Sequence, residues 1–445
     1  MTSRIEATIN GRTFSLAMIV CVVGFVFFKR FYRDLGDVFI FLVVLGTLFS
    51  VYYNFRSIRK DPIFIAFFIS IIIPVISWAN SKIQIPELAK DLPSPFLFYD
   101  FFFFWFISYW TQGKTKRIAA ILAAYCLGVI GIYLTHSTDF ISDFSRGLQG
   151  SRVDFNIVNA QYTSLFAGFG LISAAFLYIA KLDLPFKFEV PKKLGALALL
   201  VFFILVTLIT QSRQVWLALL ACILIAPLAH KLMFSSRIPA RAIILTYLVL
   251  ALVIGAAANL DIVKKRVKAE ESTLMQIVNL DLESVSKSGS IGLRIHLWSE
   301  AWEWIKKRPI LGSGEEAREL VISESETLPP NVRASFTHLH NSHLETFVSF
   351  GLLGALLIYF LIIWPPLYTT MLSSFPAGKT WSAFSVIVIV FWLVVNFFES
   401  YFYSADGIFI FSVFFGIIYS FKFAPIPANN VQLQEYPRKK YFCQT

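Results

Sequence analysis

The sequence predicts an all-α, polytopic integral membrane protein with about twelve transmembrane helices. Of its 445 residues, 57% are hydrophobic and only 15% are charged, which is too little polar surface to cover a soluble chain of this length. The apolar residues fall into runs of about 17 to 25 residues, the length that a helix needs to cross about 30 Å of hydrocarbon. None of these runs has the strict alternation of a β-barrel strand, so a helical bundle is the expected fold.

The expected spans divide the chain into four parts. In chain order, the spans are residues 13–29, 37–55, 62–80, 95–112, 118–135, 157–180, 194–210, 214–233, 242–259, 344–366, 381–399 and 406–422. The parts are nine spans over residues 1–259, a helical periplasmic loop domain over 260–343, three spans over 344–422 and a cytoplasmic tail over 423–445.

The distribution of lysine and arginine predicts the orientation. With a cytoplasmic N-terminus, the inside segments hold 20 of the 39 basic residues and the short outside loops hold 8, although Lys29, Arg30 and Arg33 run against this bias. We therefore expect both termini on the cytoplasmic side and the long segment 260–343 outside. That segment has 11 basic and 12 acidic residues, so the net charge of +11 reflects membrane topology and no nucleic-acid surface is expected.

The long outside segment contains one clear helical pattern. Large apolar residues recur at spacings of 4, 3, 4 and 3, with Ser290 as a candidate N-cap and Pro309 beyond the end. These apolar residues are Ile291, Ile295, Trp298, Trp302 and Ile305. Such a helix suits packing against the bundle or the membrane surface.

Two arginines on the outer side are candidate anion ligands. Arg213 lies in the four-residue link Gln211–Gln214 between two spans, where it either extends to the membrane interface or faces a cavity in the bundle. Arg294 lies one turn into the amphipathic helix, and its planar guanidinium suits phosphate oxygens. A single charged residue in a loop is more often simply solvated. A functional role for these two arginines is favoured because both are expected on the same side of the membrane.

Three of the six histidines, His338, His340 and His343, lie within six residues at the outer mouth of the span that begins near residue 344. Solvated loop histidines occur, but two functional interpretations remain open. The cluster can bind a metal, with Glu345 as an added carboxylate ligand. Alternatively, one imidazole can act as a general base toward a hydroxyl group.

The stretch from Ser290 to Gly354 resembles the signature region of the O-antigen ligase and O-antigen polymerase superfamily. It contains Arg294, the run Arg308–Gly314, and His340-Asn341 followed after nine residues by Gly351-Leu352-Leu353-Gly354. The Ser212-Arg213 pair resembles the family's other arginine.

The resemblance implies a GT-C-like bundle with a helical cap, a transferase of the bacterial inner membrane whose active site faces the periplasm. It implies transfer of a glycan from undecaprenyl diphosphate with inversion and without cofactor or metal. Arg213 and Arg294 would bind the diphosphate and His340 would activate the acceptor hydroxyl. Arg152, His338, Asn341 and His343 would be supporting substrate contacts.

The spacing of the His-Asn motif favours a ligase, which transfers the glycan to lipid A–core oligosaccharide. The alternatives are a polymerase, whose acceptor is a second lipid-linked glycan, and a protein O-oligosaccharyltransferase, whose acceptor is a Ser or Thr. A lipid-linked glycan transporter is an alternative of a different class. It should carry ionisable residues near the bilayer midplane and show repeat symmetry, whereas these spans are almost free of charge.

Overall fold

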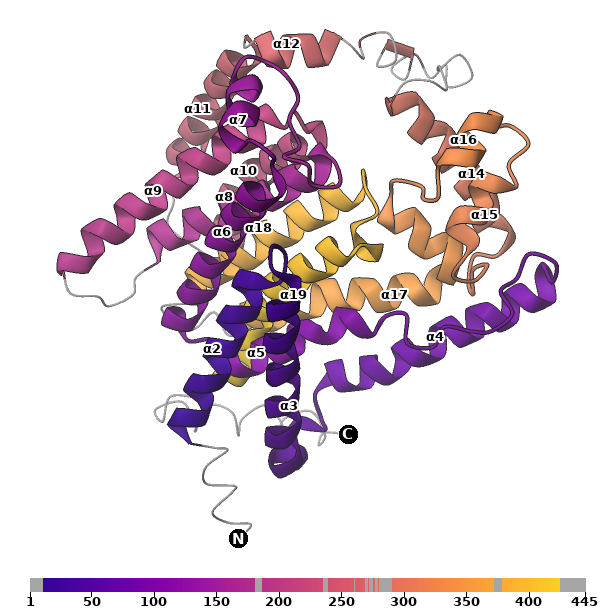
Figure 1. Cartoon of the computed structure of the whole chain (residues 1–445), viewed down its shortest axis with the longest axis horizontal. Helices are drawn as coiled ribbons and strands as arrows, with labels where there is room; N and C mark the ends of the chain where they lie inside the picture. Colours follow the sequence, from indigo (N-terminus) through magenta and orange to yellow (C-terminus); the bar gives the residue numbers. More distant parts are fainter. Residues whose placement is uncertain are drawn as a thin grey trace, which may run out of the picture.

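The computed structural model describes most of the chain and confirms the all-α fold class. The residues it describes are 11–180, 186–234, 239–259, 261–268, 271, 275–276, 279, 290–371 and 378–424. No β-strand occurs among these residues. Figure 1 shows a helical bundle with a separate group of helices, α14 to α16, at one end.

The helices follow the predicted spans closely. The first half of the bundle comprises α2 (Arg12–Phe28), α3 (Arg33–Ile58), α4 (Pro62–Gln84), η1 (Tyr99–Phe102), α5 (Phe103–Thr111), α6 (Thr115–His136), α7 (Phe140–Leu148) and α8 (Ala160–Ile179). It continues with α9 (Phe186–Ile209), α10 (Arg213–Phe234), α11 (Ala240–Ala258) and α12 (Asp261–Lys268). The remainder comprises α14 (Ser290–Lys307), α15 (Ala317–Ser323), α16 (Pro330–Ser335), α17 (Ser342–Met371), α18 (Gly378–Asn396), η2 (Tyr401–Tyr403), α19 (Ala405–Tyr419) and η3 (Ser420–Phe423).

Seven helices within the described residues are long and apolar enough to cross a membrane, and three further apolar helices are shorter. The chain is therefore a multi-pass membrane protein, and the count of twelve spans stays a prediction. The predicted span 95–112 differs most from the structure. Here a 3₁₀ turn, η1, leads into α5, which has only nine residues and at 1.5 Å per residue is too short to cross the bilayer alone.

Helices α14 to α16 form a cap on the bundle, and this cap has a separate apolar core. Leu297, Ala301 and Ile305 of α14 are buried against Val321 and Ile322 of α15. The prediction for this helix was right in its extent and partly wrong in its buried face. Trp302 is 56% exposed, because the buried face runs through positions 297, 301 and 305 instead. Ser290 is the first helical residue, and the residues before it lie outside the described part of the chain.

A break in α17 joins the cap to the bundle. Gly351 has φ +58° and ψ −154°, a conformation that only glycine adopts readily, and it interrupts the helix. The freed carbonyls of Val348 and Ser349 accept hydrogen bonds from the amides of Ser313 (2.8 Å) and Gly314 (2.9 Å). On the other side of the break, the Leu352 amide donates to the Pro309 carbonyl (2.9 Å). The two glycine-containing motifs of the sequence thus form one backbone junction.

Glycine is required at this junction because two backbone segments of the chain approach each other closely. A Cβ on Gly312 would lie 2.4 Å from the Ser349 carbonyl oxygen, and one on Gly351 would lie 2.4 Å from the Ile310 backbone. No side chain fits at either position without moving the backbone. The junction therefore fixes the cap to the first two turns of α17, the segment that follows the histidine cluster.

Candidate functional site: an arginine cavity beside a histidine–glutamate cluster

The loop that carries His340 connects α16 to α17 and is held in place at several points. The Trp298 indole N–H donates to the Leu339 carbonyl (3.1 Å), and the Leu339 amide donates to Glu345 Oε1 (2.8 Å). His340, the residue after Leu339, has φ +51°, in the left-handed region that non-glycine residues rarely adopt. Strain of this kind persists where surrounding contacts impose it, and it is common at functional sites.

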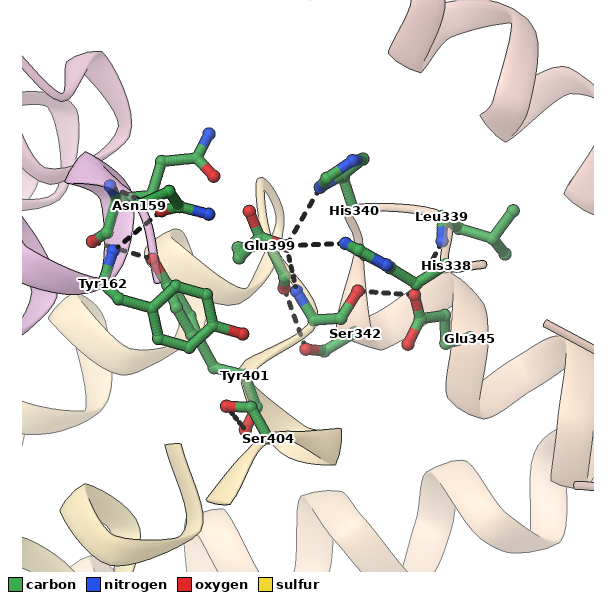
Figure 2. A network of polar contacts seen from close by, with 12 residues as sticks. Asn159, Tyr162, His338, Leu339, His340, Ser342, Glu345, Glu399, Tyr401 and Ser404 are labelled. Atoms are coloured by element: carbon green, nitrogen blue, oxygen red, sulfur yellow. Dashed lines mark hydrogen bonds and ion pairs between the residues drawn. The ribbon is translucent and has the colours of Figure 1, made fainter. Parts of the chain in front are cut away.

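Glu399 faces His340 from the other side of the cluster. It lies three residues beyond the end of α18, and its side chain is only 1% exposed. Glu399 Oε1 is 3.0 Å from His340 Nδ1 and 3.3 Å from His338 Nε2, and it accepts a third hydrogen bond from the Ser400 amide (3.1 Å). Figure 2 shows both imidazoles pointing toward this one carboxylate.

The protonation states follow from these contacts. Burial alone would raise the pKa of Glu399, but the hydrogen bonds from His338 and His340 outweigh it and lower the pKa to about 2. The hydrogen bond to Glu399 also raises the pKa of His338 above its ordinary value, against the effect of burial. An ionised Glu399 can only accept, so the Nδ1–H of His340 donates to it, and in a neutral imidazole the lone pair then lies on Nε2.

A second part of the site is a small cationic cavity of about 150 Å³. Arg152, Arg213 and Arg294 line it, and none of the described residues that line it is acidic. Arg213 is the first residue of α10, so the cavity also faces the N-terminal end of a helix, where backbone N–H groups favour anions. The volume suits a small anionic group and is too small for a glycan.

Gln161, near the start of α8, connects the two parts. When its side-chain oxygen accepts from Arg294 Nη2 (2.8 Å), its nitrogen donates to Glu399 Oε2. Gln161 also lines the arginine cavity. One side chain therefore separates the cationic cavity from the histidine–glutamate cluster, and it contacts a charged group in each.

Of the predicted site residues, Arg213 and Arg294 line the cavity, and His338 and His340 lie in the neighbouring cluster. Arg152 joins them, and its Nε donates to the Thr210 carbonyl (3.3 Å) at the edge of the cavity. The structure thus brings together His340, Arg213, Arg294, Arg152 and His338 from four separate segments of the chain.

The other two predicted contacts, His343 and Asn341, have structural roles. His343 is 5% exposed, its Nδ1 accepts from the Tyr359 hydroxyl (2.8 Å) and its Nε2 lies 3.1 Å from the Leu393 carbonyl. Both ring nitrogens are occupied inside the bundle, because residue 343 lies on the face of α17 that packs on α18. The Asn341 side-chain oxygen accepts from the amides of residues 343 and 344 (3.1 Å each) and so caps α17.

The sequence interpretation missed Glu399 and Gln161. It named Glu345 as the carboxylate of a possible metal site, but Glu345 accepts from Ser400 and the Leu339 amide and does not contact the histidines. One available signal was that Glu399 is an acid at the end of an otherwise apolar span, on the side of the histidines. Gln161 gave no such signal, since an uncharged amide near a span end is common.

The fold and the site together define a class: a multi-pass helical membrane protein with an anion cavity beside a carboxylate-oriented histidine. Residues 198–359 match a family model described as O-antigen ligase. This match confirms the resemblance to the O-antigen ligase and O-antigen polymerase superfamily, a glycosyltransferase-like family whose substrates are lipid-linked glycans. The matched stretch contains Arg213, Arg294 and His340, while Gln161 and Glu399 lie outside it.

A protein of Haemophilus influenzae, described only as an uncharacterized protein, is 24% identical to this chain over 200 residues. The similarity covers 44% of this chain and 48% of that protein, so the match spans about half the length of each.

Proposed function

We propose that this chain is an O-antigen ligase that transfers a glycan en bloc from undecaprenyl diphosphate to lipid A–core oligosaccharide. The observation that carries the proposal is the direct connection from Arg294 through Gln161 to Glu399 and His340. In the proposed reaction, the leaving diphosphate binds on the arginine side of this connection and the attacking hydroxyl binds on the histidine side. The proposed location is the bacterial inner membrane, with the site and the cap on the periplasmic side and both termini in the cytoplasm.

The arginine cavity supports the donor half of the reaction. The bond between the anomeric carbon and the diphosphate oxygen breaks, and negative charge develops on the departing diphosphate. Arg213 and Arg294 approach that charge from two different helices, α10 and α14, and Arg152 adds a third cation. Fixed guanidinium groups that meet developing charge are an effective means of lowering a barrier, and they supply what a metal ion would otherwise provide.

The histidine–glutamate cluster supports the acceptor half. The acceptor hydroxyl attacks the anomeric carbon from the face opposite the diphosphate, which inverts the configuration, and its proton passes to His340 Nε2. Glu399 holds Nδ1 of the same ring and balances the positive charge that the imidazole gains. The roles resemble those of the histidine and carboxylate in a nucleophile-activating triad.

The motif spacing of the sequence favours a ligase over the polymerase and the protein O-oligosaccharyltransferase, and the matched family supports the ligase and the polymerase equally. The transporter alternative is disfavoured by the distribution of charge. Arg213 and Arg294 line one cavity, and His340 and Glu399 form the cluster beside it, so these charged and titratable groups gather at one place and do not follow a path across the bundle.

The test is the lipopolysaccharide of a strain that lacks this gene, complemented with wild type or variants. For a ligase, the deletion leaves only uncapped core on a gel, and wild type restores the ladder. Core that carries a single repeat would instead indicate a polymerase, and an unchanged ladder would overturn both. His340→Ala should fail to restore the ladder at normal protein levels. The matched control is His136→Ala, a histidine exposed at the end of α6, which should restore it.

A further inference from the structure

His338, His340 and Glu399 are arranged as the ligands of a metal ion. Each residue offers one ligand atom, and the three atoms lie within 4.8 Å of one another. Two of the separations are much shorter: Glu399 Oε1 is 3.0 Å from His340 Nδ1 and 3.3 Å from His338 Nε2. The two imidazoles also approach each other, with ring centroids 4.2 Å apart. Hydrogen bonding to the carboxylate needs only one imidazole, and the cluster supplies two.

These separations fit a tetrahedral ion. With bonds of about 2.0–2.1 Å to nitrogen and oxygen, the ligand atoms around a tetrahedral Zn²⁺ lie about 3.3 Å apart. The two His–Glu separations are already close to that value, and the His338 and His340 nitrogens lie within 4.8 Å of each other. Two imidazoles and one carboxylate are a ligand set of zinc sites that keep a fourth position open.

The surroundings of the cluster favour an ion as well. Glu399 is buried and fixed by the Ser400 amide, and Gln161 donates to its second oxygen, so this ligand is oriented before an ion arrives. His338 is the most exposed of the three side chains, at 36%, compared with 17% for His340 and 1% for Glu399. An ion therefore has access from the His338 side.

We infer that His338, His340 and Glu399 form a binding site for a Zn²⁺-class divalent ion, and that the bound ion inhibits glycan transfer. The binding part is independent of the proposed function, and the inhibition part rests on it. An ion at this site takes the Glu399 carboxylate and the Nδ1 position of His340, and the proposed transfer needs both to orient His340 as a base. His338 supplies the third ligand atom, which a histidine–glutamate pair alone would lack.

The binding test uses the full-length protein, purified in detergent without a histidine tag. Zn²⁺ is titrated and the bound ion is counted after dialysis, while Co²⁺ reports geometry through the intense visible absorption of a tetrahedral site. We expect one ion per chain for wild type. His338→Ala and Glu399→Gln should each weaken binding at least about 100-fold, because removing a ligand costs more than the 10- to 100-fold loss typical of removing an outer contact. The matched control, His136→Ala, should bind like wild type.

Two results would overturn the binding site: no stoichiometric ion on wild type, or equal affinity in wild type and His338→Ala. A cooperative thermal unfolding transition for each variant shows that the variant is folded. His338 is much more exposed than Glu399, so His338→Ala is expected to disturb the fold less than Glu399→Gln. Because the ion is counted directly, this result stands whether or not glycan transfer is observed.

The inhibition test adds Zn²⁺ to a transfer reaction. Wild-type transfer should fall as the site fills and recover fully with a chelator, at the same Zn²⁺ concentration that half-fills the site in the binding experiment. Transfer that stops in chelator and returns with Zn²⁺ would contradict the inhibition, since the ion would then be a cofactor. Transfer that is unaffected at full occupancy would contradict it too.

Discussion

Glu399→Gln tests whether the buried carboxylate acts on His340. The substitution keeps the size of the side chain and an oxygen that can accept from the Ser400 amide, but it removes the charge that faces both imidazoles. A hydrogen bond to a charged group contributes about 1.5–3 kcal/mol, and each 1.4 kcal/mol changes a rate about tenfold. We therefore expect kcat/KM for glycan transfer to fall about 10- to 150-fold.

The assay is steady-state transfer by purified protein in liposomes, from a lipid-linked diphosphate glycan to lipid A–core. The matched control is Glu345→Gln, which removes a second fully buried carboxylate a short distance away. Glu345 contacts Ser400, the Leu339 amide and Arg318 (3.9 Å) but not His340. Glutamine keeps an oxygen for the two hydrogen bonds that anchor the His340 loop, so Glu345→Gln should leave the rate per folded molecule near wild type. A wild-type rate for Glu399→Gln, or an equal loss in both variants, would refute the reasoning.

Three further predictions concern other parts of the structure. Arg213→Ala should lower transfer about 100- to 1,000-fold, as expected for loss of a group that stabilises developing charge; Arg146→Ala, an exposed arginine outside the cavity, should leave the rate unchanged, and similar losses in both would contradict the assignment. Gly351→Ala should destabilise the protein by more than the roughly 1–3 kcal/mol of its backbone conformation alone, measured by thermal unfolding, whereas Gly195→Ala, with no atom near its Cβ, should not destabilise it. His343→Ala should lower the free energy of unfolding by about 1–3 kcal/mol through two lost hydrogen bonds; a lost rate at normal stability would return His343 to the site.

The fold was predictable because hydrophobic length and charge distribution are local properties of the sequence. Most predicted spans match a helix to within a few residues at each end. The exception, residues 95–112, is mostly apolar apart from Asp100, and it becomes η1 and α5. Several of its aromatic side chains pack inward. Phe98 contacts Phe350 (4.9 Å between ring centroids) and Phe101 contacts Phe411 (5.3 Å). Hydropathy alone does not distinguish this packing from lipid contact.

The sequence predicted the arginines and histidines of the candidate site, but not the hydrogen bonds through Gln161 and Glu399 that link them. Arg213, Arg294 and His340 were recognisable in the sequence because ionisable side chains at the end of an apolar bundle are costly to bury and are often functional. Their contact through Gln161 and Glu399 depends on how α8 and the residues after α18 pack together. The sequence also gave no means to separate His340 from His343, which lie three residues apart. In the structure, His340 lies on a loop with a strained backbone, whereas the His343 side chain lies inside the bundle.

Reconstitution tests whether transfer from a lipid-linked diphosphate glycan to lipid A–core takes place at the His340 site. Liposomes should contain only the purified protein, the donor and the acceptor, and the product is a core whose mass has increased by the glycan. We predict this product for wild type and at least about 100-fold less for His340→Ala at the same amount of folded protein. Absence of product from active wild-type preparations, or equal product from His340→Ala, would contradict the account.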